Sequence, residues 1–209
     1  MTITALEYKG KNLYTVIIDG DALFTVHSEI VLKKQLKTGM IISDQDLIDI
    51  KYMSDFRRGR ERALYLLEYR DHSAKELFDK LKKNINEDVA NDVVSKMQYL
   101  SLIDDEKYAK RYAQTLKDKG YGEIRIKNEL YKKGIDPQLI SDVIDEVVDN
   151  DPVNDIVEII NKKFYKSLFD EKGKRRSINA LMRLGYSWSD IKAAIKAVCD
   201  DLDDDFSYE

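Results

Sequence analysis

The spacing of apolar side chains differs between roughly the first fifty residues and the rest of the chain. Residues 2–8, 12–18 and 22–27 are short segments rich in Thr, Ile, Val, Tyr and Phe, separated by Gly10 and by an Asp-Gly-Asp turn at 19–21. Short β-branched and aromatic segments joined by Gly and Asp-Gly turns are typical of β-hairpins. The start of the chain therefore predicts a small antiparallel sheet.

From residue 28 onward the apolar positions follow a helical period. A short helix is expected over residues 28–36, and Gly39 ends this pattern. Ser43, with Asp46 three positions later, predicts the N-cap of a further helix. Beyond this point we expect the chain to be entirely helical.

A four-residue turn recurs three times in the helical part, at spacings of 50 and 51 residues. Its copies are Lys83-Asn84-Ile85-Asn86, Lys133-Gly134-Ile135-Asp136 and Leu184-Gly185-Tyr186-Ser187. In each copy, the second residue suits the left-handed conformation that ends a helix, the third suits a core position, and the fourth suits an N-cap. The recurrence predicts tandem three-helix units, each too short to bury an apolar face alone.

The predicted fold is therefore mainly α-helical. Three tandem three-helix repeats are expected to stack in an elongated, curved body, preceded by a small N-terminal β-containing domain. The expected boundaries are 1–52 for the N-terminal hairpin, sheet and short helices, 53–104, 105–150 and 151–199 for the three repeats, and 200–209 for a flexible acidic tail.

Composition excludes several classes of protein. One cysteine and two histidines cannot form an internal disulfide or a Cys/His zinc site, and Cys199 is expected to be a small core residue. No apolar run approaches the roughly 18 to 20 residues of a membrane span, and the first residues lack the apolar region of a signal peptide. We expect a cytoplasmic protein with no membrane contact.

Motifs that resemble catalytic or nucleotide-binding sites have simpler explanations. Gly120-Tyr121-Gly122 lacks the Lys and Ser/Thr of a phosphate-binding loop, so we interpret it as an interhelical connection. Asp104 and Asp105 precede a helix and suit an N-cap and a first-turn charge. No catalytic residue, metal site, cofactor or small-molecule substrate is expected, and the protein is predicted not to be an enzyme.

Charge is unevenly distributed along the chain. The last ten residues carry six acids and no base, so residues 1–199 sum to +2 within a net charge of -4. Bases concentrate at 107–133, with nine against three acids, and at 162–176, with seven against two. These clusters indicate an anionic partner, although a merely solvated helix face is the alternative. The candidate partner- or DNA-binding residues are Lys110, Arg111, Lys117, Lys119, Arg125, Lys127, Lys132, Lys133, Lys174, Arg175 and Arg176.

Three further motifs resemble those of the RecX family, regulators of the bacterial recombinase RecA. They are Leu67-x-x-Arg70-x-x-Ser73-x-x-Glu76-Leu77, Leu102-Ile103-Asp104-Asp105-x-x-Tyr108-Ala109 and Gly120-x-Gly122-x-x-Arg125-Ile126-x-x-x-Leu130-x-x-Lys133-Gly134-Ile135. Together they cover about residues 62–135, and the three-unit pattern extends the match to about residue 199. The N-terminal strands resemble an extension present in some members, whereas the acidic tail is not part of the family pattern.

The resemblance implies a regulatory protein that acts by binding. It would dock in the groove of RecA filaments on DNA and limit filament growth, ATP hydrolysis, strand exchange and repressor cleavage, in recombination and the SOS response. Its partners would be the RecA filament and, as a further candidate, single- or double-stranded DNA. Two alternatives remain open: an autonomous DNA-binding protein that competes for DNA, and a helical scaffold for an unrelated protein.

Overall fold

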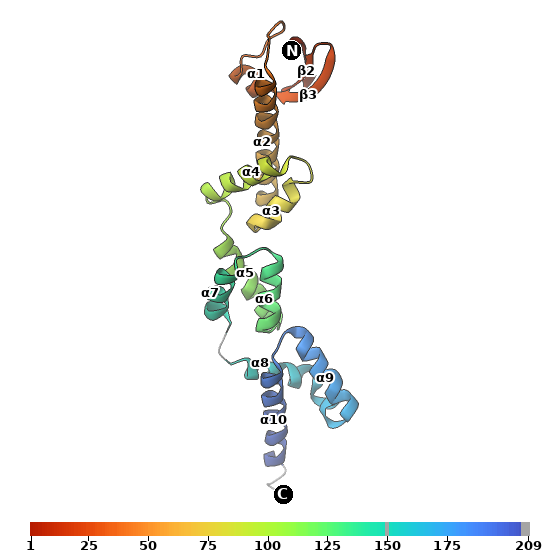
Figure 1. Cartoon of the computed structure of the whole chain (residues 1–209). Helices are drawn as coiled ribbons and strands as arrows, with labels where there is room; N and C mark the ends of the chain where they lie inside the picture. Colours follow the sequence, from red (N-terminus) through yellow and green to blue (C-terminus); the bar gives the residue numbers. More distant parts are fainter. Residues whose placement is uncertain (149–150, 206–209) are drawn as a thin grey trace. The chain divides into compact units, whose positions relative to one another are not determined.

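The computed structural model describes residues 1–148 and 151–205 (Figure 1). The chain divides into two compact units, Met1–Ile103 and Asp104–Glu209, which are described separately below.

The first unit begins with the predicted antiparallel sheet, in the order β1-β2-β3. Its strands are β1 (Ile3–Gly10), β2 (Leu13–Ile18) and β3 (Asp21–His27). Both hairpin turns use positive φ angles, at Lys11 and Asn12 in the first and at Asp19 and Gly20 in the second, as tight turns between twisted strands require. The prediction of a small N-terminal sheet is confirmed.

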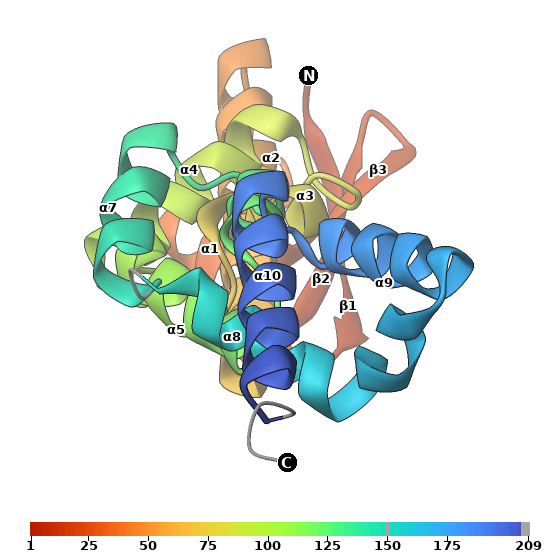
Figure 2. The same cartoon turned by 90° about the horizontal axis from the view of Figure 1, so that it is seen from below.

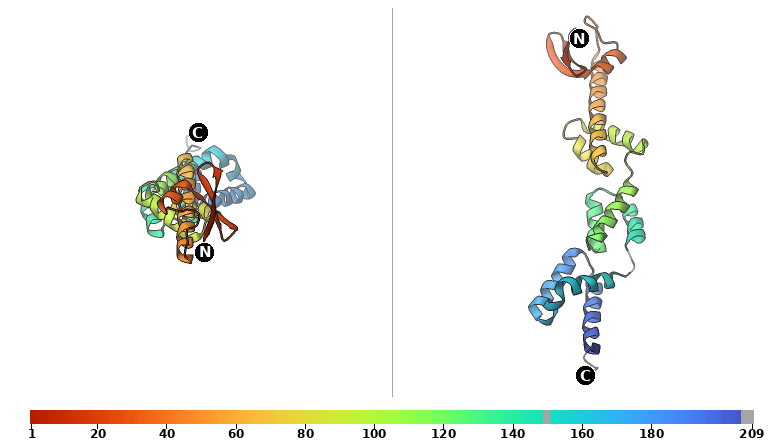
Figure 3. Two further views of the ribbon diagram at one scale, coloured as in Figure 1. Left: turned by 90° about the horizontal axis from the view of Figure 1, so that it is seen from above. Right: turned by 180° about the vertical axis from the view of Figure 1, so that it is seen from behind.

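One face of the sheet packs on two helices, α1 (Ser28–Lys33) and the start of α2 (Asp44–Tyr69), as the right-hand view of Figure 3 shows. Ile3, Val16 and Val26 are fully buried there. Ser43 caps α2: its hydroxyl accepts from the Asp46 amide, and the Asp46 carboxylate accepts from the Ser43 amide in return. The capping expected from sequence is therefore present.

Helix α2 runs without a break through the boundary predicted between residues 52 and 53. Ile50 in its first half packs in the core under the sheet, whereas Ala63 and Leu66 in its second half pack in the core of the first repeat. No Pro and no new N-cap interrupts this stretch of sequence, so nothing ends the helix. One 26-residue helix therefore belongs to both parts of the unit.

The first repeat is completed by α3 (Ala74–Leu81) and α4 (Glu87–Tyr99), capped by Ser73 and Asn86. Leu77, Val93 and Met97 are fully buried in its core. The expectation that Asn84 adopts a left-handed conformation is wrong, because Asn84 is not among the residues with positive φ. Helix α3 instead ends at Lys82 in a right-handed conformation, so no glycine-like residue is needed there.

The second unit opens with the second repeat, formed by α5 (Asp105–Asp118), α6 (Glu123–Lys132) and α7 (Pro137–Val147). Asp104 and Asp136 cap α5 and α7 as predicted. Gly134 has the expected positive φ, 75°. Ala113, Ile126, Leu130 and Val143 are fully buried in this core, which is the apolar stripe predicted by the helical period.

The third repeat contains α8 (Pro152–Ile159), α9 (Glu171–Leu184) and α10 (Trp188–Asp205). A π-helical turn over Ile160–Phe164 and a 3-10 turn over Tyr165–Phe169 lead from α8 to α9. Figure 2 shows this segment leading from α8 to the far end of α9. Ile156, Leu181 and Ile191 are fully buried in the core of this repeat.

The end of the chain differs from the sequence-based expectation in two respects. Helix α10 continues to Asp205 and so includes the first six residues of the predicted acidic tail, and residues 206–209 lie outside the described residues. Cys199 is exposed and not a core residue, since Ile191, Ile195 and Val198 already supply the buried face of α10.

Two helix ends cap each other where the second and third repeats meet. The amide of Gly122 donates to the carbonyl of Leu184 at 2.9 Å, and the amide of Ile124 donates to the carbonyl of Gly185 at 3.2 Å. Helix α6 has no side-chain cap, so the C-terminal carbonyls of α9 satisfy its free amides. A Cβ on Gly122 would lie 2.5 Å from the Gly185 oxygen, so this α6–α9 junction requires glycine.

Gly122→Ala should therefore destabilise the second unit by more than about 2 kcal/mol, because the two repeats must separate to admit the methyl group. Gly120→Ala is the matched comparison: Gly120 has φ 76°, but a Cβ there would meet only Ile159 Cδ1 at 3.6 Å, an ordinary contact, so only backbone strain of about 1 to 2 kcal/mol is expected. Urea unfolding of both variants measures the difference. Equal losses of stability would show that the close approach at Gly122 is not limiting.

A buried histidine links two parts of the first repeat. His72 is 3% exposed, and its Nδ1 lies 2.8 Å from the carbonyl oxygen of Arg70. Since a carbonyl only accepts, Nδ1 carries the proton, and Nε2 is free to accept from the Lys80 ammonium at 2.9 Å. Burial disfavours the imidazolium and lowers the pKa of His72, and the charges of Arg70 and Lys80 lower it further.

This lowered pKa predicts a pH-dependent stability. Below about pH 6.5 the unfolded chain binds a proton at His72 that the folded protein does not, so the free energy of unfolding should fall as the pH drops from about 7.5 to 5.5. One such group contributes a slope of at most about 1.4 kcal/mol per pH unit. Urea unfolding across this range should lose that slope in His72→Gln and keep it in His27→Gln. A slope unchanged in His72→Gln would refute the assignment.

Candidate partner and nucleic-acid interface

Lys110, the first predicted site residue, joins two helices of the second repeat. Its ammonium lies 3.0 Å from Glu106 on α5 and 2.7 Å from Glu146 on α7. Hydrogen bonds to Glu146 and then Glu106 raise the pKa of Lys110 to about 12. Its charge is therefore largely used inside the repeat and is not presented alone to a partner.

Two further predicted cations bind helix C-termini. The Lys117 ammonium donates to the carbonyl of Val147 at the end of α7, at 3.1 Å. Arg125 donates to the carbonyl of Arg183 near the end of α9, also at 3.1 Å, and its guanidinium lies 3.9 Å from the centroid of the Tyr121 ring. Cations are favourable at helix C-termini, and Arg125 adds a cation–π contact at the α6–α9 junction.

The remaining candidates on α5 and α6 differ in how much charge they present. Lys127 pairs with Glu123 at 2.5 Å, and Lys132 pairs with Glu129 at 2.9 Å. Lys133 lies beside the half-buried Tyr112, with its ammonium 5.5 Å from the ring centroid. Arg111 and Lys119 are exposed. The structure thus does not bring these residues together into one free basic patch.

Helix α9 carries a more continuous basic surface. Lys172, Arg176 and Arg183 follow the spacing i, i+4, i+11, which places them on one face of the helix, and all three side chains are exposed. The opposite face buries Gly173, Ser177 and Leu181 against the third repeat. We call Lys172, Arg176 and Arg183 the α9 stripe.

Charge on the α9 stripe is available to a partner. Among the side chains that the structure describes, those of residues 1–148 and 151–199, none forms an ion pair with the three cations of the stripe. Of the predicted residues on α9, Arg176 belongs to the stripe, Lys174 is exposed on another face, and Arg175 approaches Glu171 at 3.8 Å. Lys172 and Arg183 were not among the predicted site residues, although the seven-residue step from Arg176 to Arg183 was a visible signal.

Metal-binding side chains do not cluster in the part of the chain that the structure describes. That part contains no group of three or more His, Cys, Asp or Glu side chains able to hold a metal ion. Asp104 caps α5 by accepting from the Lys107 amide, which lowers the pKa of its carboxyl. Nor does any described helix have the length and apolarity to cross a bilayer. The clearest unassigned chemical feature of the second unit is therefore exposed positive charge.

Comparison with known proteins identifies the family. The model of the first three-helix domain of RecX matches residues 60–97, and that of the second matches residues 104–144. "Regulatory protein RecX" of Bacillus subtilis (strain 168) is 30% identical over 213 aligned positions, covering 99% of this chain and 81% of the relative. This chain belongs to the RecX family. A second relative, "Regulatory protein RecX" of Streptococcus sanguinis (strain SK36), is 28% identical over 93% of this chain and 76% of its own.

Solved RecX structures share the fold. A crystal structure of regulatory protein RecX superimposes with a TM-score of 0.66 at 22% identity, covering 92% of this chain and 98% of its own. RecX from Lactobacillus salivarius gives 0.61 at 29% identity over 69% of this chain and 96% of its own. The predicted helical fold with a small N-terminal sheet is confirmed, and RecX is a regulatory family, not an enzyme family. The α9 stripe lies outside both matched domain models.

The contacts of Arg125 change what its substitution should do. Arg125→Ala should destabilise the protein by about 1 to 2 kcal/mol, because it removes a charged hydrogen bond and a cation–π contact at the α6–α9 junction. Lys119→Ala, at an exposed position, should change stability by less than about 0.5 kcal/mol. Thermal unfolding followed by circular dichroism compares the two variants. If Arg125→Ala unfolded at the same temperature as the native protein, the structural role of Arg125 would be refuted, and its charge would again be a candidate for partner binding.

Proposed function

We propose that this RecX-family protein regulates RecA by binding RecA filaments on DNA, and that binding limits filament growth and ATP hydrolysis. The observation that carries the proposal is the α9 stripe, whose three cations are exposed and have no ion pair among the described residues. The relatives named regulatory protein RecX support a regulatory role. The cytoplasm, which holds the bacterial chromosome and its recombinase, would be the site of action.

A polyanionic partner suits this surface on physical grounds. Three unpaired cations along one face of α9 span 11 residues, or about 16 Å of helix. Such a row raises the local positive potential and speeds the approach of a polyanion. When its cations neutralise phosphates, the counterions bound to the polyanion are released, which favours binding. A filament of RecA on DNA offers a long anionic surface with which several of these charges can engage at once.

Regulation by binding also agrees with how the chain uses its other charges. Lys110, Lys117 and Arg125 hold helices together, so they maintain the repeats that present α9. Under this proposal the second repeat supports the surface, and the third repeat carries it. Of the sequence-based candidates Lys174, Arg175 and Arg176, Arg176 belongs to the α9 stripe, whereas Arg175 faces Glu171.

The direct test is ATP hydrolysis by the cognate RecA on single-stranded DNA, with and without this protein. Substoichiometric native protein should slow hydrolysis and shorten filaments. The triple variant Lys172→Gln/Arg176→Gln/Arg183→Gln should need at least about tenfold more protein for the same inhibition, since it removes three charge-assisted hydrogen-bond donors.

A second triple variant is the matched control. Lys127→Gln/Lys132→Gln/Arg175→Gln removes the same charge from the same unit, but at side chains that already face a carboxylate. It should inhibit RecA like the native protein. Equal loss of inhibition in both triple variants would mean that net charge, not the α9 stripe, governs binding. No effect of native protein on RecA would overturn the proposed function itself.

A further inference from the structure

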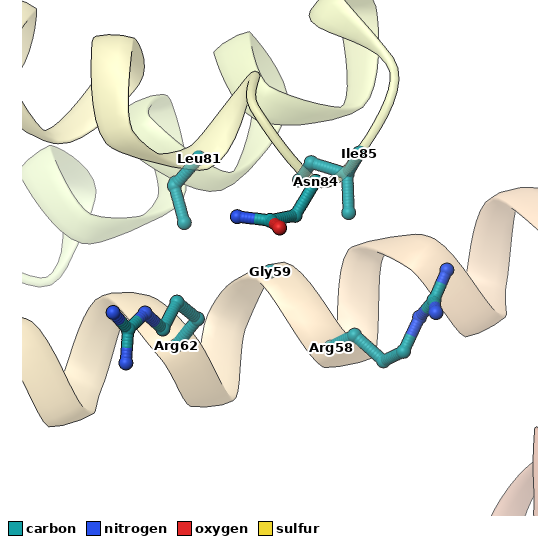
Figure 4. Close-up of a pocket in the computed structure, with 6 residues that line it drawn as sticks. All are labelled: Arg58, Gly59, Arg62, Leu81, Asn84 and Ile85. Atoms are coloured by element: carbon teal, nitrogen blue, oxygen red, sulfur yellow. The ribbon is translucent and has the colours of Figure 1, made fainter.

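A pocket of about 340 Å³ lies in the first unit, between α2 and the turn that joins α3 to α4. Arg58, Gly59, Arg62, Leu81, Asn84 and Ile85 line it. Figure 4 shows the Asn84 amide extending from the turn toward α2, with Arg62 and Arg58 leaving the helix on either side of Gly59. The two guanidinium groups point away from each other, so one lies at each end of the pocket, with the Asn84 amide and an apolar wall between them.

Close packing of the backbone gives the pocket its form. A Cβ on Gly59 would lie 2.7 Å from Ile85 Cδ1 and 3.0 Å from Val93 Cγ2, so glycine lets α2 approach the turn. The two arginines, one on each side of this glycine and four residues apart, lie about 6 Å apart along the helix axis. Asp55 forms an ion pair with Arg58 and orients it, while the other N–H groups of the guanidinium remain available.

Two exposed tyrosines continue the row of arginines along α2. Arg58, Arg62, Tyr65 and Tyr69 follow the spacing i, i+4, i+7, i+11, which places all four on one face, and we call them the α2 stripe. Tyr65 is 63% exposed and Tyr69 is 87% exposed, so core packing does not account for either ring. The Arg62 guanidinium lies 5.2 Å from the centroid of Tyr65, which joins the cationic and aromatic parts of the stripe.

We infer that the α2 stripe binds single-stranded nucleic acid, with one backbone phosphate on Arg58 and another on Arg62, at the two ends of the pocket, and with bases stacked on Tyr65 and Tyr69. Guanidinium groups match phosphate oxygens with paired hydrogen bonds, and the Asn84 amide is a further donor. Aromatic rings beside a basic row are the arrangement that holds single strands without reading sequence, because every base has a π face.

The tyrosines distinguish this ligand from an acidic peptide. A carboxylate partner would use the two arginines equally well, but it would leave two exposed rings without a role. Stacking on unpaired bases employs the rings and the charges of the same helix face together. The inference goes beyond the proposed function, since it gives this chain a DNA contact in the unit that does not contain α9.

Fluorescence anisotropy of a labelled oligothymidine, measured in the absence of RecA, tests the inference. The native protein should bind, and Arg58→Gln/Arg62→Gln should weaken binding. The same variant should reduce the slope of log K against log salt by about 1.4, because each phosphate that is no longer neutralised lowers the slope by about 0.7. Tyr69→Ala should weaken binding by about fivefold to 100-fold with little change in that slope.

Matched controls lie in the same unit. Arg60→Gln removes a charge from another face of α2, and Tyr99→Ala removes a ring that is 80% exposed on α4, so both should bind like the native protein. Circular dichroism should show native thermal unfolding for every variant that is compared. An oligothymidine affinity unchanged in both the arginine and the tyrosine variants would overturn the inference, as would an absence of binding by the native protein.

Competition separates the possible ligands. If inorganic phosphate or polyaspartate displaced the oligonucleotide at equal charge concentration, base stacking on Tyr65 and Tyr69 would contribute nothing to binding. The inference would then be overturned, and the pocket would be a general anion site. RecA hydrolysis measured on the same samples keeps the two proposals apart. Native protein that inhibits RecA without binding oligothymidine would refute this inference while the proposed function stood.

Discussion

The free amides at the start of α6 have no partners within their own repeat, and the third repeat supplies them. Carbonyls of Leu184 and Gly185, themselves left free at the end of α9, accept from Gly122 and Ile124. Each helix end thus satisfies the other, where unsatisfied buried groups would cost about 1 to 3 kcal/mol each. The contact ties the second and third repeats together and fixes where α9 lies within its unit.

This junction also determines which positive charges are available. Arg125 donates across this junction to the carbonyl of Arg183 and lies over the ring of Tyr121, so its charge stabilises the junction. Lys110 and Lys117 hold α7 against α5 in a similar way. The exposed face of α9, opposite the buried Leu181, carries Lys172, Arg176 and Arg183, which form no ion pair with any side chain that the structure describes. A count of bases along the chain does not separate these two uses.

In the first unit, helix α2 joins the sheet to the first repeat. Its first half covers the sheet and its second half completes the first repeat, so the small N-terminal sheet shares a continuous helix with the repeat that follows. A single 26-residue helix carries a long solvent-facing side as well as two buried segments. That side offers the row of arginines and tyrosines, which no charge cluster in the sequence had indicated.

Turns, helix caps and left-handed backbone positions were predictable from the sequence, because residues close together along the chain determine them. The hairpin turns, the caps at Ser43, Asp104 and Asp136, and the positive φ of Gly134 and Gly185 depend on residues a few positions apart. The same locality made the three-helix repeat visible, since its apolar positions recur at a fixed helical period. Asn84 is the exception, because a turn that ends at Lys82 needs no left-handed residue.

Only the tertiary structure decided which charges are free and which helices are shared. The partner of Arg125 is a carbonyl 58 residues away, and the second partner of Lys110 lies on another helix, so neither contact has a sequence signature. Likewise, the pocket beside Gly59 exists because the α3–α4 turn packs on α2. Sequence determines which side chains a helix face carries, but a charge is free only when folding brings no opposite charge or carbonyl within reach.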